Sequence, residues 1–411
     1  MRLIHLADLH LGKSLHRVSL LEAGDQPHWV DSFLRLCGEV QPDAVLIAGD
    51  VYDRGAPAAG AVELLSRLLT GLTDRGIQVL LIPSNHDSPQ RLAFGRELLA
   101  REGLHIAPPL TAPGALTRVT LADEYGPVDF WLMPYLFPAL AAEALETELR
   151  DYDAAVRAVL AAQPVDFTRR NVLVAHQNVT VGGVEVERGG SETMVGGVGQ
   201  VDASAFDGFD YVALGHIHAG YALGRPGVRY AGSPLCYHFQ ETRQAAKGPL
   251  LVELKEKGTE PTITLLPLEP LHRMRMAEGS YEALRAAEAA RPEGNEYVSL
   301  SLTDRRITPE IAEDLRSLLE AKGSLLLELS SGYQAEAGEA GLSAAALDEM
   351  GLPELFAAFY TQRRSGAEPD EATLALLRKA GELAERADFR LPPEDTEIGQ
   401  LLQLALQEGQ A

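Results

Sequence analysis

The stretch HLADLHLGK, residues 5–13, decides the fold of this chain. It overlaps a short apolar run, Leu3–Ala7, that is typical of a buried β-strand and is followed at once by Asp8 and His10. Four later apolar runs also end next to Asp, Asn or His, and they span Ala44–Ala48, Val79–Ile82, Val172–Ala175 and Tyr211–Leu214. Strands that carry such side chains at their C-terminal ends place them along one edge of a sheet, where loops converge. The sequence therefore predicts an α/β fold with a polar site at that edge.

The side chains at the ends of these runs are of the kinds that bind divalent metal ions. Neutral imidazoles suit transition ions and carboxylates suit harder ones, so a mixed set favours Mn²⁺, Fe or Zn over Mg²⁺. An Asp that bridges two ions about 3.5–4 Å apart lets them share a hydroxide and clamp a phosphate. The pattern therefore predicts a two-metal phosphoesterase centre. Its candidate ligands are Asp8, His10, Asp50, Asn85, His176, His216 and His218.

Five short motifs, in this order along the chain, resemble those of the calcineurin-like metallophosphoesterases. They are D-x-H, G-D-x-x-D, N-H-D, A-H-Q and G-H-I-H. The surrounding stretches AGDVYDRG, IPSNHDS, ALGHIHAGY and YAGSPLCYHFQE narrow the resemblance to the SbcD family, the nuclease components of bacterial SbcCD complexes. The resemblance is dense over residues 1–270 and implies an α/β, two-sheet metallophosphoesterase sandwich with flanking helices.

The resemblance also implies a role for each candidate residue. One ion would be held by Asp8, His10 and His218, the other by Asn85, His176 and His216, with Asp50 as the bridge. His86 would contact the phosphate or protonate the leaving oxygen. Asp87 would orient His86 through a carboxylate–imidazole hydrogen bond.

Three further positions lie close to these motifs. Asp53 ends the G-D-x-x-D motif, and Arg188 lies in the glycine-rich loop Val181–Gly199, so both are candidates for contacts with the metal ligands or the substrate. The glycines of that loop permit close approach to a ligand, although a plain connector would have the same composition. Ser84 stands where the family more often has Gly before N-H-D, which affects only the local loop.

The pattern of apolar residues divides the chain into four parts. Residues 1–270 form the predicted nuclease domain, with helices expected at Trp29–Val40, Ala61–Asp74 and Ala139–Val159. Residues 271–330 are predicted to form a small α+β cap domain. Its helices are expected at Tyr281–Ala290 and Pro309–Ala321, and its strands at Tyr297–Leu302 and Leu325–Leu329. Residues 331–346 have the composition of a linker, and residues 347–411 are expected to form a helical tail.

The tail carries an apolar face formed by Leu355, Phe356, Phe359 and Tyr360. Aromatic side chains on a short helical tail have little chain to pack against, which favours a partner-binding surface. Packing of the tail helices on each other or on the cap would produce the same pattern. The resemblance names the partner as an SbcC-type ATPase, bound at the base of its coiled coil.

The formal net charge of −23 argues against a chain that binds nucleic acid on its own. Affinity for DNA depends mainly on Lys and Arg side chains that neutralise phosphates. Metal ions at the site, a local cationic patch or a basic partner would offset the charge. The candidates for such a patch are Lys13, Arg54, Arg188, Arg225, Arg229 and Arg243. The two cysteines lack metal-binding spacing and no apolar run suits a membrane span, which indicates a cytoplasmic protein. The resemblance to a DNA nuclease implies that it is nucleoid-associated.

The activity implied by the resemblance is a Mn²⁺-dependent DNA nuclease with two metal ions. It would act as a 3′–5′ exonuclease on duplex ends and as an endonuclease on hairpins and single strands, in DNA repair, recombination and replication. A homodimer would form through a helical face such as Trp29–Leu36 or Val62–Leu69, although periodicity does not distinguish such a face from the core. The homodimer would assemble with the ATPase into a heterotetramer. Two alternatives remain at this point: a phosphodiesterase or phosphatase for small molecules, and a scaffold without catalytic activity.

Overall fold

The computed structural model describes residues 1–149, 151–182, 199–243 and 246–333. By its internal contacts the chain separates into two units, Met1–Tyr333 and Gln334–Ala411. The second unit lies outside the described residues, and with it the predicted helical tail. Predicted positions that lie outside the described residues are Arg188, Leu355, Phe356, Phe359 and Tyr360.

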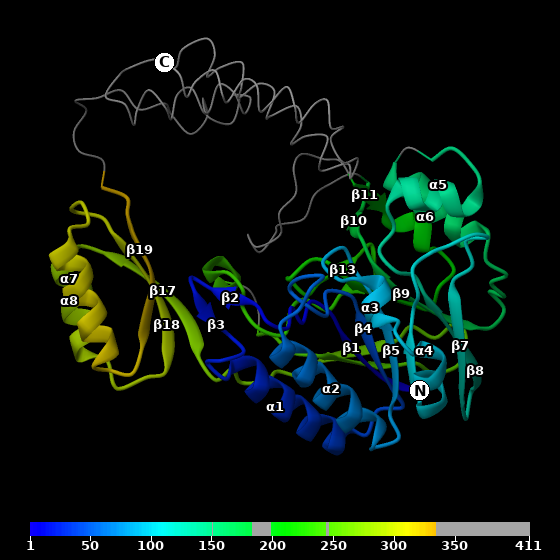
Figure 1. Ribbon diagram of the computed structural model, residues 1–411, viewed down its shortest axis with the longest axis horizontal. Coiled ribbons are helices and arrows are strands. Elements are labelled where there is room, and N and C mark those ends of the chain that lie inside the picture. Colours follow the sequence, from blue (N-terminus) through cyan, green and yellow to red (C-terminus); the bar gives the residue numbers. More distant parts are fainter. Residues whose placement is uncertain (150, 183–198, 244–245, 334–411) are drawn as a thin grey trace, which may run out of the picture. The chain divides into compact units, whose positions relative to one another are not determined.

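Two six-stranded sheets form the body of the first unit (Figure 1). The first sheet has the order β16-β15-β1-β4-β5-β6. Its strands are β1 (Arg2–Leu6), β4 (Ala44–Ala48), β5 (Gln78–Ile82), β6 (Leu104–Ile106), β15 (Leu250–Glu253) and β16 (Thr262–Leu265). The second sheet has the order β13-β14-β12-β9-β8-β7. Its strands are β7 (Thr117–Asp123), β8 (Gly126–Leu132), β9 (Arg170–His176), β12 (Tyr211–Gly215), β13 (Ala222–Leu223) and β14 (Arg225–Tyr230).

The central strands of each sheet run parallel, which determines where the site forms. In the first sheet β1, β4, β5 and β6 are parallel, and in the second β8, β9, β12 and β14 are parallel. Strands buried on both faces are expected to be continuous apolar runs, and β4 and β12 are buried at every position. The C-terminal ends of the central strands therefore meet at common edges, as the sequence predicted.

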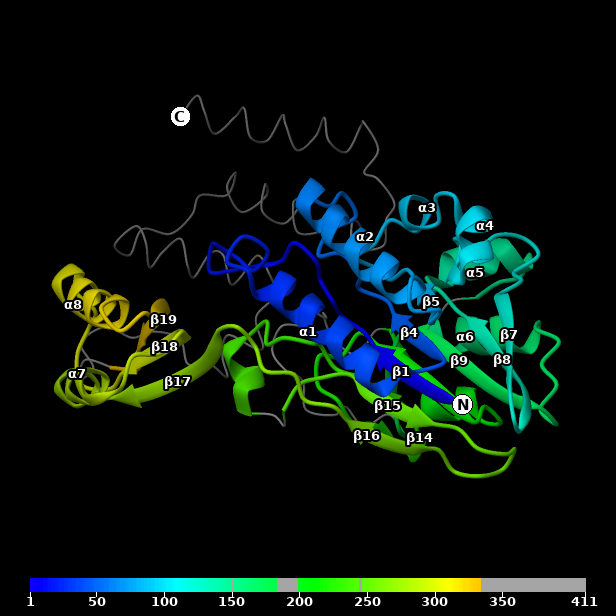
Figure 2. The ribbon, with the colours of Figure 1, turned by 90° about the horizontal axis from the view of Figure 1, so that it is seen from below.

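Helices cover the outer faces of both sheets, so the two-sheet sandwich predicted from the resemblance is confirmed. Helices α1 (Asp25–Val40) and α2 (Ala59–Thr73) lie side by side on the first sheet (Figure 2). Helices α5 (Pro138–Leu145) and α6 (Tyr152–Ala161) pack on the second sheet. A third apolar core between the sheets contains Leu46, Phe130 and Val174. Trp29 and Phe33 stack inside the first core, so these two side chains are not available for a dimer face.

The single helix predicted over Ala139–Val159 is wrong, because two helices occupy this stretch. Helix α5 ends at Glu146, which takes a left-handed backbone conformation with φ of 51°. Helix α6 begins after Asp151, whose carboxylate accepts a hydrogen bond from the backbone N–H of Ala154. The Ala-rich composition hid this break, since neither Gly nor Pro marks it.

The remaining short elements lie in the connections of the sandwich. They are β2 (Ser14–Leu15), β3 (Val18–Ser19), α3 (Pro89–Leu92), α4 (Arg96–Leu99), η1 (Ala100–Glu102), β10 (Asn178–Thr180), β11 (Gln200–Asp202), η2 (Ala203–Phe206) and η3 (Phe239–Arg243). Among the described residues, no helix combines the length and the apolar character that a membrane span requires.

A small domain follows the sandwich and alternates strands with helices. Its elements are β17 (Arg273–Gly279), α7 (Tyr281–Ala290), β18 (Glu296–Leu302), α8 (Pro309–Glu320) and β19 (Leu325–Ser331). The three strands form a parallel sheet in the order β17-β18-β19, and both helices pack on it around Leu300 and Leu315. Strand β17 was not predicted: its alternation of polar and apolar side chains covers only Arg273–Met276, and none of its residues is fully buried. The domain therefore begins with a strand and not with the expected helix.

Candidate metal centre

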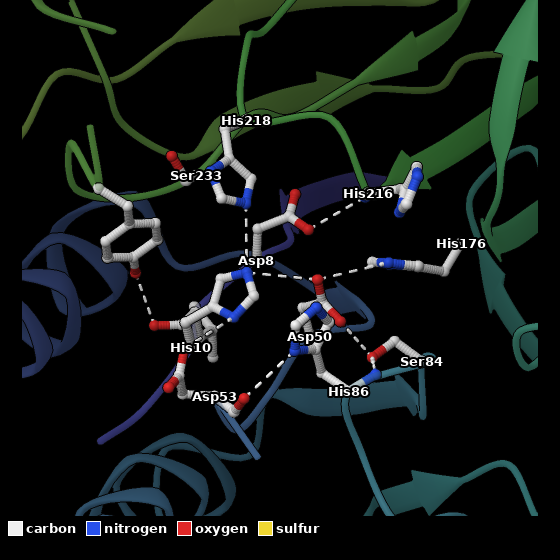
Figure 3. Close-up of polar contacts among 12 residues, drawn as sticks. Asp8, His10, Asp50, Asp53, Ser84, His86, His176, His216, His218 and Ser233 are labelled. Carbon is white, nitrogen blue, oxygen red and sulfur yellow. Dashed lines mark hydrogen bonds and ion pairs between the residues drawn. The ribbon is translucent and has the colours of Figure 1, made fainter. Parts of the chain in front are cut away.

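The C-terminal ends of β1, β4, β5, β9 and β12, with the loops that follow them, converge (Figure 3). They bring together six of the predicted ligands, and the seventh, Asn85, lies between Ser84 and His86 on the loop after β5. We call this part of the molecule the metal edge; its residues are Asp8, His10, Asp50, Asn85, His176, His216 and His218. Four of them leave the ordinary backbone regions, with positive φ at Asp8, His10, Asp50 and His216. Such conformations are strained for residues other than Gly, and they cluster at functional sites. The strain turns each side chain inward directly after its strand.

Asp50 occupies the middle of the metal edge. Its Oδ2 atom lies 3.3 Å from Nε2 of His10 on one side and 3.5 Å from Nε2 of His176 on the other. Nε2 of His10 also lies 3.2 Å from Nε2 of His218. Asp8, His10, Asp50 and His218 each offer a ligand atom, and these atoms all lie within 4.8 Å of one another. One carboxylate with imidazoles on both sides is the arrangement that a bridging ligand requires.

Two glycines allow the two sheets to approach each other at this edge. A Cβ on Gly49 would lie 2.4 Å from Nδ1 of His176, and a Cβ on Gly215 would lie 2.0 Å from the carbonyl oxygen of Ala48. That carbonyl accepts a hydrogen bond from Nδ1 of His176 at 2.8 Å. The bond fixes the ring, so that Nε2 carries the lone pair and faces Asp50.

The chemistry of the donor set fits divalent cations. Burial lowers the pKa of His10 to about 4 and that of His216 to about 3, so both imidazoles are neutral at neutral pH, the form that binds metal. Nε2 of His176 and Oδ1 of Asn85 are buried and make no hydrogen bond to the described residues. Among the described residues, the basic side chains that contact the Asp50 carboxylate are the imidazoles of His10 and His176, and burial lowers the pKa of both. A buried carboxylate between neutral imidazoles is a favourable position for a cation.

Comparison with known proteins shows which family the chain belongs to. A sequence profile described as calcineurin-like phosphoesterase matches residues 1–220, and the SbcD_C profile, described as type 5 capsule protein repressor C-terminal domain, matches residues 267–364. The chain is 34% identical over 291 residues to the SbcD component of nuclease SbcCD from Staphylococcus saprophyticus, covering 69% of this chain and 73% of the relative. It belongs to the SbcD family of calcineurin-like phosphoesterases. The protein of the same name from Staphylococcus epidermidis is 29% identical over 308 residues, covering 74% of this chain and 79% of that relative.

In this SbcD-family chain Asp87 does not orient His86, which corrects the role predicted for it. The Asp87 carboxylate instead accepts hydrogen bonds from the backbone N–H groups of Val51, Tyr52 and Ser84 at 2.9–3.1 Å. Nδ1 of His86 lies 3.2 Å from the carbonyl oxygen of Asp53. The buried Asp87 is thus directed toward the loop that carries Asp50, whereas His86 is exposed at the rim.

Asp53 lies next to the metal edge, together with part of the predicted cationic patch. Oδ1 of Asp53 forms an ion pair with Lys13 at 2.9 Å and lies 3.7 Å from Nδ1 of His10. Arg54 is exposed next to it. Arg225 is instead bound within the second sheet, where it donates to the carbonyl oxygens of Phe206 and Phe209. Of the predicted patch, Lys13 and Arg54 therefore lie beside the metal edge, and Arg225 is held by backbone carbonyls of the second sheet.

The structure adds three side chains to the metal edge that sequence reasoning missed. The buried Ser84 hydroxyl contacts carboxylates of both Asp50 and Asp87. The Tyr135 ring, which follows β8, lies 6.1 Å from that of His176 and 6.4 Å from that of His216. Tyr237 packs against His10 and His218 with ring centroids 5.3 and 5.4 Å away. Ser84 and Tyr237 had local signals, since they lie in the stretches IPSNHDS and YAGSPLCYHFQE, but neither was assigned a contact with the ligands.

Proposed function

We propose that this chain is a metal-dependent phosphodiesterase that cleaves DNA, acting as the nuclease component beside an SbcC-type ATPase. The observation that carries the proposal is Asp50, a buried carboxylate with an imidazole within 3.5 Å on each side. The names of both relatives, each the SbcD component of nuclease SbcCD, support DNA as the substrate and the ATPase as the partner.

The metal edge supports a centre with two ions, for which Mn²⁺ suits the mixture of nitrogen and oxygen ligands. Asp8, His10 and His218 would hold one ion, Asn85, His176 and His216 the other, and Asp50 both. Ions bound there would lower the pKa of a water molecule and stabilise charge on the attacked phosphate.

His86 is the residue proposed to donate a proton to the leaving oxygen. Its ring is exposed at the rim and lies edge-on to that of His10, with centroids 5.1 Å apart. Nδ1 faces the carbonyl oxygen of Asp53, which favours a proton on Nδ1. The proton donor would therefore be the imidazolium form of His86, which carries a second proton on Nε2 and becomes neutral when that proton passes to the leaving oxygen. A side chain that is oriented but exposed can reach a phosphodiester outside the buried ligand cluster.

The finer properties of the family belong to the same proposal. They are 3′–5′ exonuclease activity on duplex ends, endonuclease activity on hairpins and single strands, a homodimer, and a heterotetramer with the ATPase. The acidic net charge supports the need for a partner, because a chain of charge −23 repels DNA at long range.

The test is cleavage of a labelled DNA hairpin by the full chain with Mn²⁺ or Mg²⁺, beside Asp50→Ala, His86→Ala and the control His105→Ala. His105 lies on β6 and contacts Gln78, away from the metal edge. Cleavage that is lost in the first two variants and retained in the third supports the proposal. His86→Ala with full activity would refute the proton-donor role.

A chromogenic phosphodiester assayed in parallel tests the alternative of a small-molecule enzyme. Hydrolysis of that compound without DNA cleavage, both for the chain alone and together with the ATPase and ATP, would favour the alternative. A chain that binds Mn²⁺ at the metal edge but hydrolyses neither substrate would instead favour a scaffold.

A further inference from the structure

A buried carboxylate lies directly behind the metal edge and has no role in the mechanism above. Glu241, in η3, is 1% exposed, and its two oxygens have different partners. Oε1 lies 3.3 Å from Nδ1 of His218. Oε2 lies 2.8 Å from Nζ of Lys247 and accepts from the backbone N–H of Tyr237 at 3.2 Å. The carboxylate therefore joins a candidate metal ligand to a cation.

The contact with Glu241 determines which nitrogen of His218 is available to bind a metal ion. A carboxylate accepts but does not donate, so Nδ1 of His218 carries the proton and Nε2 carries the lone pair. Nε2 is the atom that lies 3.2 Å from Nε2 of His10. Two imidazole nitrogens at this distance, both next to the Asp50 carboxylate, are the arrangement in which a shared cation is held.

Lys247 holds the backbone of His218 as well as the carboxylate. Its Nζ donates to the carbonyl oxygen of His218 at 2.9 Å and to Oγ of Ser233 at 2.7 Å. The 2.8 Å contact between Nζ of Lys247 and Oε2 places a cation beside the buried carboxylate, as a carboxylate in such a position requires. The ring and the carbonyl of His218 are thus fixed by one ion pair.

A second buried ion pair shows what a purely structural arrangement looks like. Glu288 in the small domain is 3% exposed, and its two oxygens accept from NH1 and NH2 of Arg275 at 2.8 and 2.6 Å. Its neighbours include no candidate metal ligand. Glu241 differs in that Oε2 lies at Lys247 and Oε1 lies at His218, a candidate metal ligand.

We propose that Glu241 and Lys247 form a positioning pair that presents Nε2 of His218 to one of the two metal ions. The inference rests on the proposed metal centre. It adds that the histidine ligands of the two ions are held in place by different kinds of group. His176 is fixed through a neutral backbone carbonyl, whereas His218 is fixed through a charged carboxylate. A carboxylate behind an imidazole raises the basicity of the ligand nitrogen, and loss of such a partner lowers metal affinity by about 10- to 100-fold.

The experiment measures Mn²⁺ binding to the full chain by the electron paramagnetic resonance signal of free Mn²⁺. It compares wild type, Glu241→Gln, Glu241→Gln with Lys247→Met, and the matched control Glu288→Gln. Wild type is expected to bind two ions. Glu241→Gln is expected to retain one at wild-type affinity and to bind the other about 10- to 100-fold more weakly. Glu288→Gln is expected to unfold at a lower temperature and to bind both ions normally.

The double variant distinguishes loss of His218 positioning from the effect of leaving the Lys247 charge without its carboxylate. It removes the lysine cation that Glu241→Gln leaves without its carboxylate, and replacement of a buried ion pair by neutral side chains generally preserves folding. If the double variant still binds one ion weakly, the positioning role is supported. Normal binding of both ions by Glu241→Gln, or full recovery in the double variant, would overturn the inference alone. A wild type that binds no Mn²⁺ would overturn the proposed metal centre and the inference with it.

Discussion

The metal edge and the small domain differ in how their buried polar groups are satisfied. At the metal edge Asp8, His10 and Asp50 have positive φ, and buried polar atoms such as Oδ1 of Asn85 make no hydrogen bond to the described residues. In the small domain the buried Glu288 has both oxygens paired with Arg275. The small domain thus satisfies this buried charge within the chain, whereas the metal edge leaves polar atoms that metal ions are expected to satisfy.

The helices of the two regions show the same difference at their first turns. Helices α7 and α8 begin at Ser280 and Thr308, whose side chains accept from backbone N–H groups of the first turn. Helices α1 and α2, which follow the loops of the metal edge, begin at Gly24 and Ala58 without a side-chain cap. Local stability is thus better developed in the small domain, and the sandwich depends more on its three apolar cores.

The largest effect that follows from this comparison is expected for Asp50→Asn. The variant removes the charge that both halves of the site share, so Mn²⁺ affinity and DNA cleavage should each fall by more than about 100-fold, beyond the range for residues behind the ligands. The metal-free protein should unfold at the same temperature or higher, because Asn tolerates positive φ and removes a buried charge that lacks a cationic partner. Thermal unfolding in chelator checks this, and a marked loss of stability would contradict it.

Asp87→Asn tests whether Asp87 acts on the Asp50 loop or on His86. The carboxylate accepts three backbone hydrogen bonds, and each bond to a charged group is worth about 1.5–3 kcal/mol. We expect Mn²⁺ affinity to fall about tenfold, which corresponds to about 1.4 kcal/mol, because the loop that carries Asp50 loosens. A fall in kcat at saturating Mn²⁺ with unchanged Mn²⁺ affinity would show that Asp87 acts on His86 after all.

The sequence predicted the sandwich and the convergence of the ligands because both have local signals. An apolar run followed by Asp, Asn or His marks a strand and its C-terminal loop without any knowledge of the neighbours, as at Ala44–Ala48 before Asp50. Helix α7 was predicted with its observed bounds, since its apolar spacing and its Ser280 cap are both visible in the sequence.

The errors occur where the decisive partner is distant in sequence. Asp87 lies next to His86, and only the folded chain shows that the Asp87 carboxylate binds Val51 and Tyr52. Tyr135 reaches the metal edge because β8 lies beside β9, and sequence alone does not reveal that neighbour. Strand β17 is stabilised by pairing with β18, and its own strand pattern, the alternation of Arg and Met, is only four residues long.

The pH dependence of stability tests the effect of burying His5, a neutral histidine of the first sheet. His5 on β1 is buried against the Tyr211 hydroxyl at 2.8 Å, and burial lowers its pKa to about 3. The unfolded chain binds the proton near pH 6.5 and the folded chain does not, so this contribution to stability is complete above pH 6.5 and is lost as the pH falls toward 3. At pH 5 the loss from His5 alone is about 2 kcal/mol.

The control for that titration is His5→Gln, which cannot take up the proton. Its free energy of unfolding, measured in chelator at pH 7.5 and pH 5, should fall by about 2 kcal/mol less than that of wild type. Equal losses in the two proteins would show that His5 does not contribute.

The smallest effects come from exchanging the helix caps of the two regions. Ser280→Ala removes the hydroxyl that accepts from the N–H of Ala283 at 3.3 Å, which should cost about 1 kcal/mol of stability. Ala58 has extended backbone angles suited to a cap, φ −66° and ψ 152°, and its side chain is exposed, so Ala58→Ser should add up to about 1 kcal/mol. Both variants should bind Mn²⁺ as wild type does, since neither touches a candidate ligand. If Ala58→Ser instead weakens Mn²⁺ binding, the first turn of α2 affects the metal ligands through the loop that carries Asp50. The absence of a side-chain cap at Ala58 would then contribute to metal binding.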